Sequence, residues 1–123
     1  MCKFGRTSKF RLNSCCSNLQ MLMNVAIVNT PIDFSVIQGY RGQELQDLYF
    51  ERGKSQVKFP SGNHNKIPSL AVDIVPYPID WLNIDRFKIL HEHILKVAKK
   101  LRIEIVWGGD WSFKDYVHYE LKL

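Results

Sequence analysis

The sequence predicts a small α+β domain in which an antiparallel sheet is flanked by helices. The helical and strand patterns follow one another without the regular strand–helix–strand alternation that builds a parallel sheet. The chain has 123 residues, of which 46% are hydrophobic and 24% are charged. This length and composition are typical of one globular domain, so we expect a single domain over residues 1–123.

The first half of the chain carries a helix, a strand and a second helix. An apolar stripe at helical spacing predicts a helix over residues 19–27, and Pro31 ends it. Residues 33–40 are predicted to form a strand, and residues 42–53 a short helix that ends at Gly53. The side chains of this second helix that we expect to face inward are Leu45, Leu48 and Tyr49.

The second half begins with a loop over residues 54–69, which is rich in Gly, Asn, Ser and Pro. A strand over residues 70–75 follows, and then a helix with Asn83 or Asp85 as its N-cap. The apolar stripe of that helix consists of Phe87, Leu90, Ile94, Val97, Ala98 and Leu101. The remaining elements are a strand over 102–107, a loop over 108–115 and a strand over 116–121.

Charge, cysteine content and hydropathy limit the function classes. The net charge is +5, which favours anionic partners, but Lys and Arg are scattered and not interleaved with stacking aromatics. We therefore expect no nucleic-acid partner. Cys2, Cys15 and Cys16 form no spaced disulfide framework and are expected to be free thiols. Neither an apolar run of ~20 residues nor a secretory signal is present, so we expect no membrane span and synthesis in the cytoplasm.

The strand over residues 70–75 carries a carboxylate, Asp73, among apolar residues. Burial of a carboxylate is costly unless its charge is compensated. Strand alternation turns Asp73 away from the apolar core face. In the last strand His118 and Glu120 share a face, so His118 meets Asp73 if the two strands are neighbours. His64 lies on the loop that leads into the first of these strands.

Two imidazoles and one carboxylate are a suitable ligand set for catalytic zinc, which typically keeps three protein ligands and a water. The cation would also compensate the charge of Asp73. The alternative is a salt-bridged aspartate beside two ordinary histidines, and the spacing alone does not select between the two.

Two further residues fit such a site. Asp115 precedes His118 by three residues, so its carboxylate is a candidate base for a zinc-bound water; the alternative is a turn or capping residue. Arg41 lies between a strand and a helix, where a guanidinium could hold a substrate carboxylate or an oxyanion; the alternative is a surface arginine. In contrast, His91 and His93 point to different faces of a helix and are not expected to share a metal.

The chain resembles a known peptidase group in three stretches that occur in the same order. These are QGYRGQELQDLYFERGKS, HNKIPSLAVDIVPYPIDW and VWGGDWSFKDYVHYEL. The group is the VanY-like zinc D-alanyl-D-alanine carboxypeptidases, and the branch it resembles is the L-alanyl-D-glutamate endopeptidases of bacteriophage endolysins. The resemblance covers nearly the whole chain and implies the Hedgehog/DD-peptidase fold.

The resemblance implies a role for each matched residue. The implied zinc ligands are His64, Asp73 and His118. Asp115 is implied to be the catalytic acidic residue and Arg41 the family arginine, with Gln46 one helical turn further on. These are the positions that the residue chemistry had already singled out, except for Gln46.

Further expectations concern the surroundings of the site. The family serine stands two residues before the zinc histidine, where this chain has Gly62, so Ser61 would have to substitute through a shifted loop. Glu120 either orients the His118 imidazole or is a surface strand residue. The side chains expected to shape the cleft wall or to fix the following loop are Trp107, Asp110 and Trp111.

The resemblance implies a zinc-dependent hydrolase that cuts the L-alanyl-D-glutamate bond of the peptidoglycan stem peptide. The alternatives are a D-alanyl-D-alanine carboxypeptidase and a non-catalytic wall-binding relative. The catalytic domain is expected to fill residues 1–123 without a separate cell-wall-binding domain, and to be a monomer. A lysin made in the cytoplasm would need help, such as a holin, to reach the wall.

Overall fold

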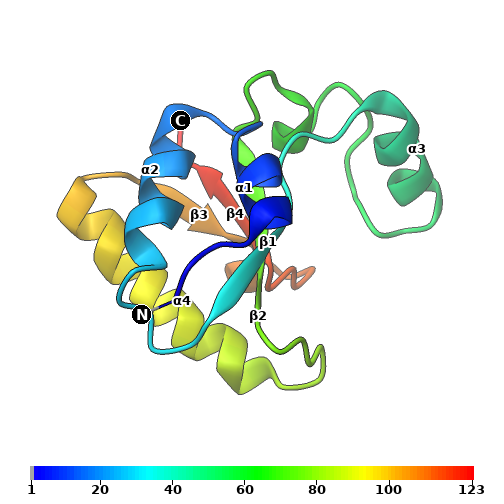
Figure 1. Ribbon diagram of the computed structural model, residues 1–123. Helices are drawn as coiled ribbons and strands as arrows, with labels where there is room; N and C mark the ends of the chain where they lie inside the picture. Colours follow the sequence, from blue (N-terminus) through cyan, green and yellow to red (C-terminus); the bar gives the residue numbers. More distant parts are fainter. Residues whose placement is uncertain (1) are drawn as a thin grey trace.

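The computed structural model describes residues 2–123 and contains a four-stranded sheet with the order β1-β2-β4-β3 (Figure 1). All three pairs of neighbouring strands are antiparallel. The strands are β1 (Phe34–Gln38), β2 (Ala71–Pro76), β3 (Ile105–Trp107) and β4 (His118–Leu121). The helices are α1 (Arg6–Leu12), α2 (Ser17–Ala26), α3 (Gln43–Glu51) and α4 (Ile84–Leu101). The predicted α+β class is therefore confirmed.

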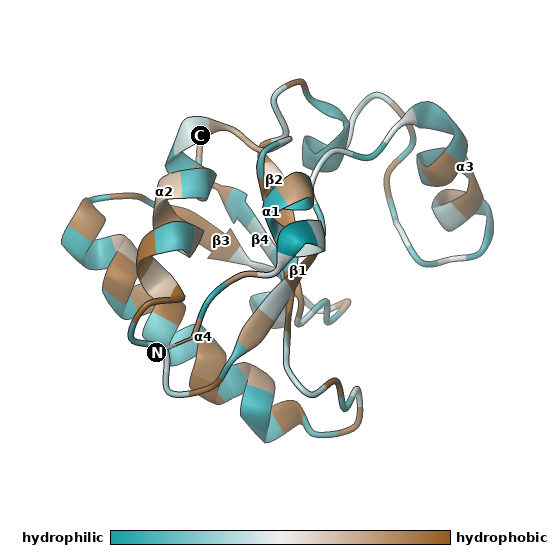
Figure 2. Ribbon diagram, viewed as in Figure 1, coloured by the Kyte–Doolittle hydropathy of each residue, from teal (hydrophilic) through white to brown (hydrophobic). Residues whose placement is uncertain are grey.

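The core lies between α2, α4 and one face of the sheet. Figure 2 shows apolar residues recurring along both helices, with hydrophilic residues between them. The buried side chains that these elements share include Leu19, Leu22, Met23, Val72, Ile74, Leu90, Ile94 and Tyr119. Burial of each large apolar side chain contributes about 1.5–3 kcal/mol to the free energy of folding, so packing against α2 and α4 stabilises the sheet. Asp73 points to the other face, as strand alternation predicts.

The position of α3 corrects one prediction. Leu45 and Tyr49 are only partly buried and Leu48 is exposed. Within α3, all of whose residues are described, the single buried side chain is Gln46. Figure 1 shows the reason, because α3 stands apart from the sheet and its helical neighbours. Its inner side therefore meets a polar environment and not the apolar core.

Three further observations concern the ends of the chain's elements. Helix α1 precedes the apolar stripe over 19–27; its sequence RTSKFRL is mostly polar, and only Ser8 and Leu12 are buried. The predicted strand over 102–107 begins later, at Ile105, since Arg102 adopts a left-handed conformation (φ 56°) that ends α4. The predicted strand over 116–121 begins at His118.

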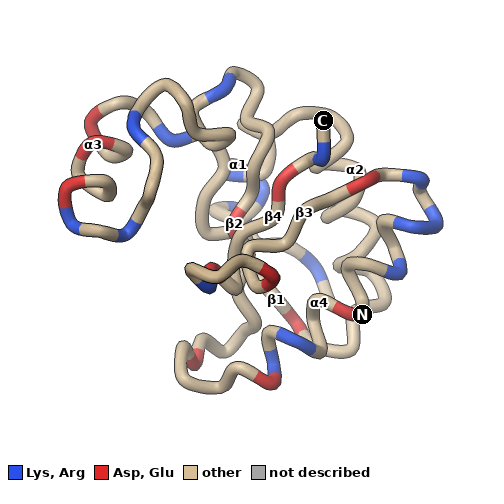
Figure 3. The backbone as a smooth tube through the Cα atoms, turned by 180° about the vertical axis from the view of Figure 1, so that it is seen from behind, with Lys and Arg blue, Asp and Glu red and all other residues tan. Residues whose placement is uncertain are grey.

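The basic residues occupy many separate segments of the chain, as Figure 3 shows. In residues 2–123, no helix combines the length and the apolar character that a membrane crossing requires.

The three cysteines are free thiols, as predicted, and their environments differ. Cys15 is buried, whereas Cys2 and Cys16 are partly exposed. Burial, followed by the neighbouring Cys16, raises the pKa of Cys15 to about 12. The Cys15 thiol therefore stays protonated at neutral and mildly alkaline pH, and the thiolate is the reactive form.

We expect an alkylating reagent at pH 8 to modify Cys2 and Cys16 in the native protein and to spare Cys15 until denaturant is added. Peptide mapping by mass spectrometry reads each site separately, and Cys16 serves as the internal control. Equal labelling rates at Cys15 and Cys16 in the native protein would show that this packing is wrong.

Candidate active site

A cleft of about 610 Å³ opens on the sheet face opposite the core. Strands β2 and β4 form its floor, and the loop after α3 and the loop before β4 contribute its walls. The predicted site residues that line it are Arg41, Gln46, Ser61, His64, Asp73, Trp111, Asp115, His118 and Glu120. The cleft thus gathers residues from several separate segments of the sequence.

Three ligand atoms meet at the floor of the cleft. Asp73 and His118 are directly paired in neighbouring strands, and His64 reaches them from the short 3-10 helix η1 (Asn63–Asn65). The Nε2 atom of His64 lies 3.1 Å from Asp73 Oδ1 and 3.2 Å from His118 Nδ1. His118 Nδ1 lies 3.3 Å from the same Asp73 oxygen. The three atoms therefore form a nearly equilateral triangle.

In each imidazole, one nitrogen points away from the triangle, and its hydrogen bond determines which of the two nitrogens carries the proton. His64 Nδ1 is 2.7 Å from the carbonyl oxygen of Gly39, which can only accept, so Nδ1 carries the proton. His118 Nε2 is 2.7 Å from Glu120 Oε1 and donates to that carboxylate. When both rings are neutral, the inward nitrogens present lone pairs beside the Asp73 carboxylate. Three converging lone pairs are a site for a cation.

The electrostatics of the triangle favour positive charge. Burial alone would raise the pKa of Asp73, but the charge of His64 and the hydrogen bonds with both imidazoles hold it well below its ordinary value. Burial likewise lowers the pKa of His118, yet its hydrogen bonds with Asp73 and Glu120 raise it to about 9. The carboxylates thus attract a proton or a metal ion to this position.

The donor set fits zinc. Ligand atoms about 2.0–2.1 Å from a tetrahedral ion are separated from one another by roughly 3.3 Å, which matches the triangle. His64, Asp73 and His118 are buried and form the candidate metal-binding cluster among residues 2–123. Three protein ligands leave a fourth position for water or substrate, which is the arrangement of catalytic zinc sites.

Asp115 lines the same cleft from the loop before β4. Its main-chain N–H donates to Gly108 O at 3.0 Å, and its carbonyl accepts from His118 N at 3.2 Å. A methyl group on Gly108 would overlap the main-chain oxygen of Asp115, so glycine permits this close approach. Burial, and then the charge of Asp73, raise the pKa of the Asp115 carboxyl group above its ordinary value. A raised pKa suits a carboxylate that accepts a proton during a reaction.

Arg41 is buried and held by several partners on the wall of the cleft. Its Nε and Nη2 atoms donate to Gln38 Oε1, and Nη1 donates to Gln46 Oε1 at 3.1 Å. Nη2 also lies 3.5 Å from Asp73 Oδ2, and the guanidinium stacks 4.5 Å above the Tyr49 ring. The guanidinium is therefore fixed next to the ligand triangle.

Gln46 joins this arginine to two loops. Its Oε1 accepts from Arg41 Nη1 and from Asn65 Nδ2, while its Nε2 donates to Ser55 Oγ and Val57 O. The side chain is fully buried, so each of these bonds lacks competition from water. Gln46 consequently ties α3 and the loop after it to Arg41 on the cleft wall and to Asn65 of η1.

Gln46→Leu keeps the size of the side chain but removes these bonds, and leaves the Arg41 and Asn65 donors without an acceptor. Leaving a buried polar group unpaired costs about 1–3 kcal/mol. We expect a corresponding fall in the free energy of unfolding by denaturant, with faster amide hydrogen exchange in α3. Gln43→Leu, on the exposed start of the same helix, is the matched control. Equal losses in the two variants would contradict the anchoring role.

Other predicted residues are placed differently. Trp107 and Asp110 are not among the residues that line the cleft, so of the two roles expected for them only that of fixing the following loop remains. Trp107 does contact the loop before β4, because its Nε1 donates to Tyr116 O at 2.9 Å. Trp111 lines the cleft and packs its ring 5.0 Å from the His118 ring.

Ser61 lines the cleft but is exposed and contributes no side-chain bond to the triangle among the described residues. The family serine position, Gly62, is crowded: its N–H donates to Asn65 Oδ1 at 2.9 Å, and a Cβ there would press on that amide. Asn65 therefore fills the place where a serine side chain would start.

His91 and His93 lie outside the cleft and make separate contacts within the fold. His91 stacks on Trp107 at 3.8 Å and contacts the Tyr119 hydroxyl, and His93 Nε2 is 2.8 Å from Ala26 O. Both are structural contacts, as predicted for neighbours on different helix faces.

Several residues that contribute to the candidate active site were not predicted from the sequence. Glycine at position 39 lets the strand end pass α1, and its carbonyl orients His64. Asn63 Nδ2 donates to Glu120 Oε2 at 2.7 Å and so supports the carboxylate that holds His118. Lys54, Trp81 and Phe113 line the cleft. The sequence signal that could have indicated these contacts is glycine at the end of a strand, because such a glycine often marks a place where another segment of backbone comes close.

Comparisons with known proteins converge on one activity. Residues 1–122 match the family model described as phage L-alanyl-D-glutamate peptidase. The chain is 30% identical over 123 residues to the L-alanyl-D-glutamate peptidase of Escherichia phage T5, covering 98% of this chain and 89% of that protein. It is 28% identical over 115 residues to the peptidoglycan L-alanyl-D-glutamate endopeptidase CwlK of Bacillus subtilis, covering 80% and 66%.

A solved structure supports the same assignment. The L-Ala D-Glu endopeptidase ChiX of Serratia marcescens superposes with a TM-score of 0.85 at 25% identity, covering 98% of this chain and 90% of that one.

Proposed function

Since the chain belongs to the phage L-alanyl-D-glutamate peptidase family, we propose that it is a zinc-dependent endolysin cutting the L-alanyl-D-glutamate bond of peptidoglycan stem peptides. The observation that carries the zinc part is the triangle of His64, Asp73 and His118, whose spacing and free lone pairs fit a tetrahedral ion. When bound, zinc would supply Lewis-acid polarisation of the scissile carbonyl and a more acidic water.

The residues around the triangle have separate roles in the reaction. Asp115 accepts the proton of the attacking water and passes it to the leaving amine of D-glutamate. Arg41 binds a stem-peptide carboxylate or the developing oxyanion, because its charge is held at the cleft wall beside Asp73. Glu120 keeps the His118 ring in the orientation in which Nδ1 faces His64 and Asp73.

The bond that is cut is the first point to test. Purified peptidoglycan is digested, and the new termini are identified by mass spectrometry. We expect new N-terminal D-glutamate and no released D-alanine. Free D-alanine as the main product would establish a D-alanyl-D-alanine carboxypeptidase, and absence of any new terminus would favour a non-catalytic wall-binding protein.

A further inference from the structure

The position of the scissile bond places a sugar close to the metal triangle. In peptidoglycan the L-alanine of the stem peptide is joined to the muramic acid of the glycan strand. If the proposed function is correct, only this one residue separates the scissile carbonyl from the sugar substituent. One residue spans at most about 3.6 Å, and only the short lactyl ether of muramic acid joins it to the sugar ring, so the ring of an uncut strand reaches the walls of the cleft.

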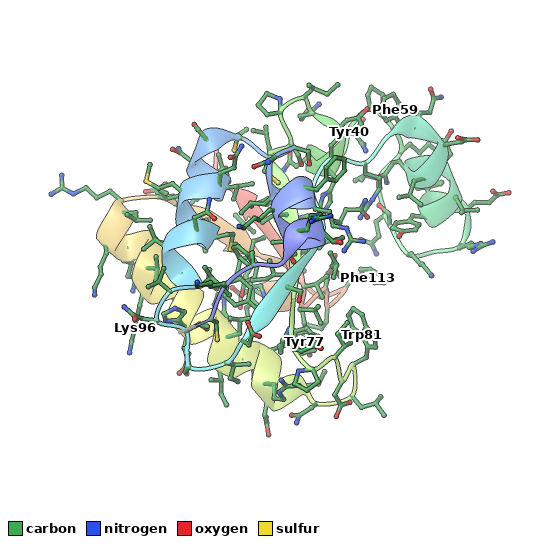
Figure 4. The ribbon with its side chains drawn as sticks, in the orientation of Figure 1. Tyr40, Phe59, Tyr77, Trp81, Lys96 and Phe113 are labelled. Carbon is green, nitrogen blue, oxygen red and sulfur yellow. The ribbon has the colours of Figure 1, made fainter. Side chains whose placement is uncertain are left out.

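The cleft has one wall that suits a sugar. We define the aromatic wall as Trp81, Trp111 and Phe113, all of which line the cleft. Trp111 packs against the His118 ring, so the wall begins at the ligand triangle. Figure 4 shows Trp81 and Phe113 on the same side of the molecule, below α3 in this view, and they come from two different loops.

The aromatic wall leaves large apolar areas in contact with water. The exposed fractions are 56% for Trp81, 42% for Phe113 and 36% for Trp111. Packing holds the Trp81 side chain in position, because its ring stacks on that of Phe87 with 6.2 Å between the ring centroids and an interplanar angle of 25°. Exposed aromatic side chains gathered at a cleft mark a binding surface. The C–H face of a pyranose ring is apolar and flat, so it can cover such rings.

The rest of the cleft carries the complementary chemistry. The loop after α3 contributes Lys54, Ser55 and Gln56, and Lys54 adds a cation near the Tyr49 ring. The part of the stem peptide that begins with D-glutamate carries carboxylates, which suit a cationic and polar surface. The uncharged aromatic wall is left for the sugar on the other side of the scissile bond.

We propose that the aromatic wall binds the muramic acid residue that bears the stem peptide, and so selects stem peptides still attached to glycan. This inference rests on the proposed function, since it assumes the bond that is cut. The substrate then crosses the cleft in one direction, with sugar on Trp81 and Phe113 and the acidic peptide beside Lys54.

Binding of peptide-free glycan strands tests the wall without any cleavage. Strands stripped of stem peptides are titrated calorimetrically into the wild-type protein, Trp81→Ala, Phe113→Ala and Trp81→Phe. We expect about tenfold weaker binding for each alanine variant, and recovery in Trp81→Phe, which keeps an aromatic face. Phe10→Ala is the matched control, because Phe10 is 79% exposed on α1 and does not line the cleft.

Two outcomes of this titration would overturn the inference: wild-type protein that does not bind the strands, or alanine variants that bind them as Phe10→Ala does. Loss of self-association or of vesicle binding in the alanine variants, with unchanged glycan binding, would likewise assign the wall to another occupant.

A kinetic comparison separates this inference from the proposed function. The KM for a glycan fragment bearing stem peptides is compared with the KM for the free L-alanyl-D-glutamyl peptide. We expect the wild type to have a lower KM for the glycan-bearing substrate than for the free peptide. In Trp81→Ala we expect the ratio of these two KM values to fall about tenfold. If the wild type cuts both with equal KM, the inference fails while the peptidase assignment stands. If it cuts neither, the proposed function fails.

Discussion

Asp115→Asn is expected to lower the rate of stem-peptide hydrolysis by about 10²–10⁴-fold while the protein still binds one equivalent of zinc. The amide has nearly the same shape as the carboxylate but cannot accept the proton of the attacking water. Asp115 is not part of the ligand triangle, so its replacement leaves His64, Asp73 and His118 in place. The rate is measured by mass spectrometry of digested peptidoglycan, and zinc by elemental analysis.

The matched control is Asp47→Asn, which makes the same change at an exposed position on α3. It should hydrolyse peptidoglycan at the wild-type rate. Near-normal turnover by Asp115→Asn would remove this residue from the role of base, and loss of zinc in that variant would point instead to a role in metal binding.

His64→Ala is expected to lose both zinc and activity. The substitution removes one of three protein ligands, and two ligands hold a catalytic zinc far more weakly than three. It also leaves the buried Asp73 carboxylate with one imidazole fewer to compensate its charge. We expect substoichiometric metal after dialysis and no detectable release of new N-terminal D-glutamate.

His93→Ala provides a histidine control, because His93 contacts the end of α2 and lies outside the ligand cluster. That variant should keep zinc and activity even if it is somewhat less stable. Stoichiometric zinc in purified His64→Ala would contradict the assignment of His64 as a ligand.

Local patterns in the sequence were sufficient for the pairing at the cleft floor. Strand alternation has a period of two, so it could assign Asp73, His118 and Glu120 to a polar face before their strands were known to be neighbours. The structure pairs Asp73 directly with His118 and places Glu120 on the same side. The role of these residues as zinc ligands and support remains a prediction.

Features that depend on long-range packing could not be predicted in the same way. The apolar positions of α3 suggested a helix facing the core, but the helix stands apart and is anchored through Gln46. Trp107 and Asp110 are close in sequence to Asp115 yet do not line the cleft, whereas Trp81 reaches it from a distant loop. Sequence proximity does not show which loops share a wall.

The backbone partners of the site were also invisible to pattern analysis. His64 is oriented by the main-chain carbonyl of Gly39, and a carbonyl has no residue signature. The close contact of Gly108 with Asp115 is seen only once both loops are in place.

The most direct test of the account is metal removal followed by replacement on intact peptidoglycan. Wild-type protein is depleted with a chelator, dialysed and mixed with increasing zinc, and new N-terminal D-glutamate is quantified by mass spectrometry. We expect the depleted protein to be inactive and its activity to return in proportion to added zinc up to one equivalent. Full activity in protein in which elemental analysis detects no metal would contradict this expectation.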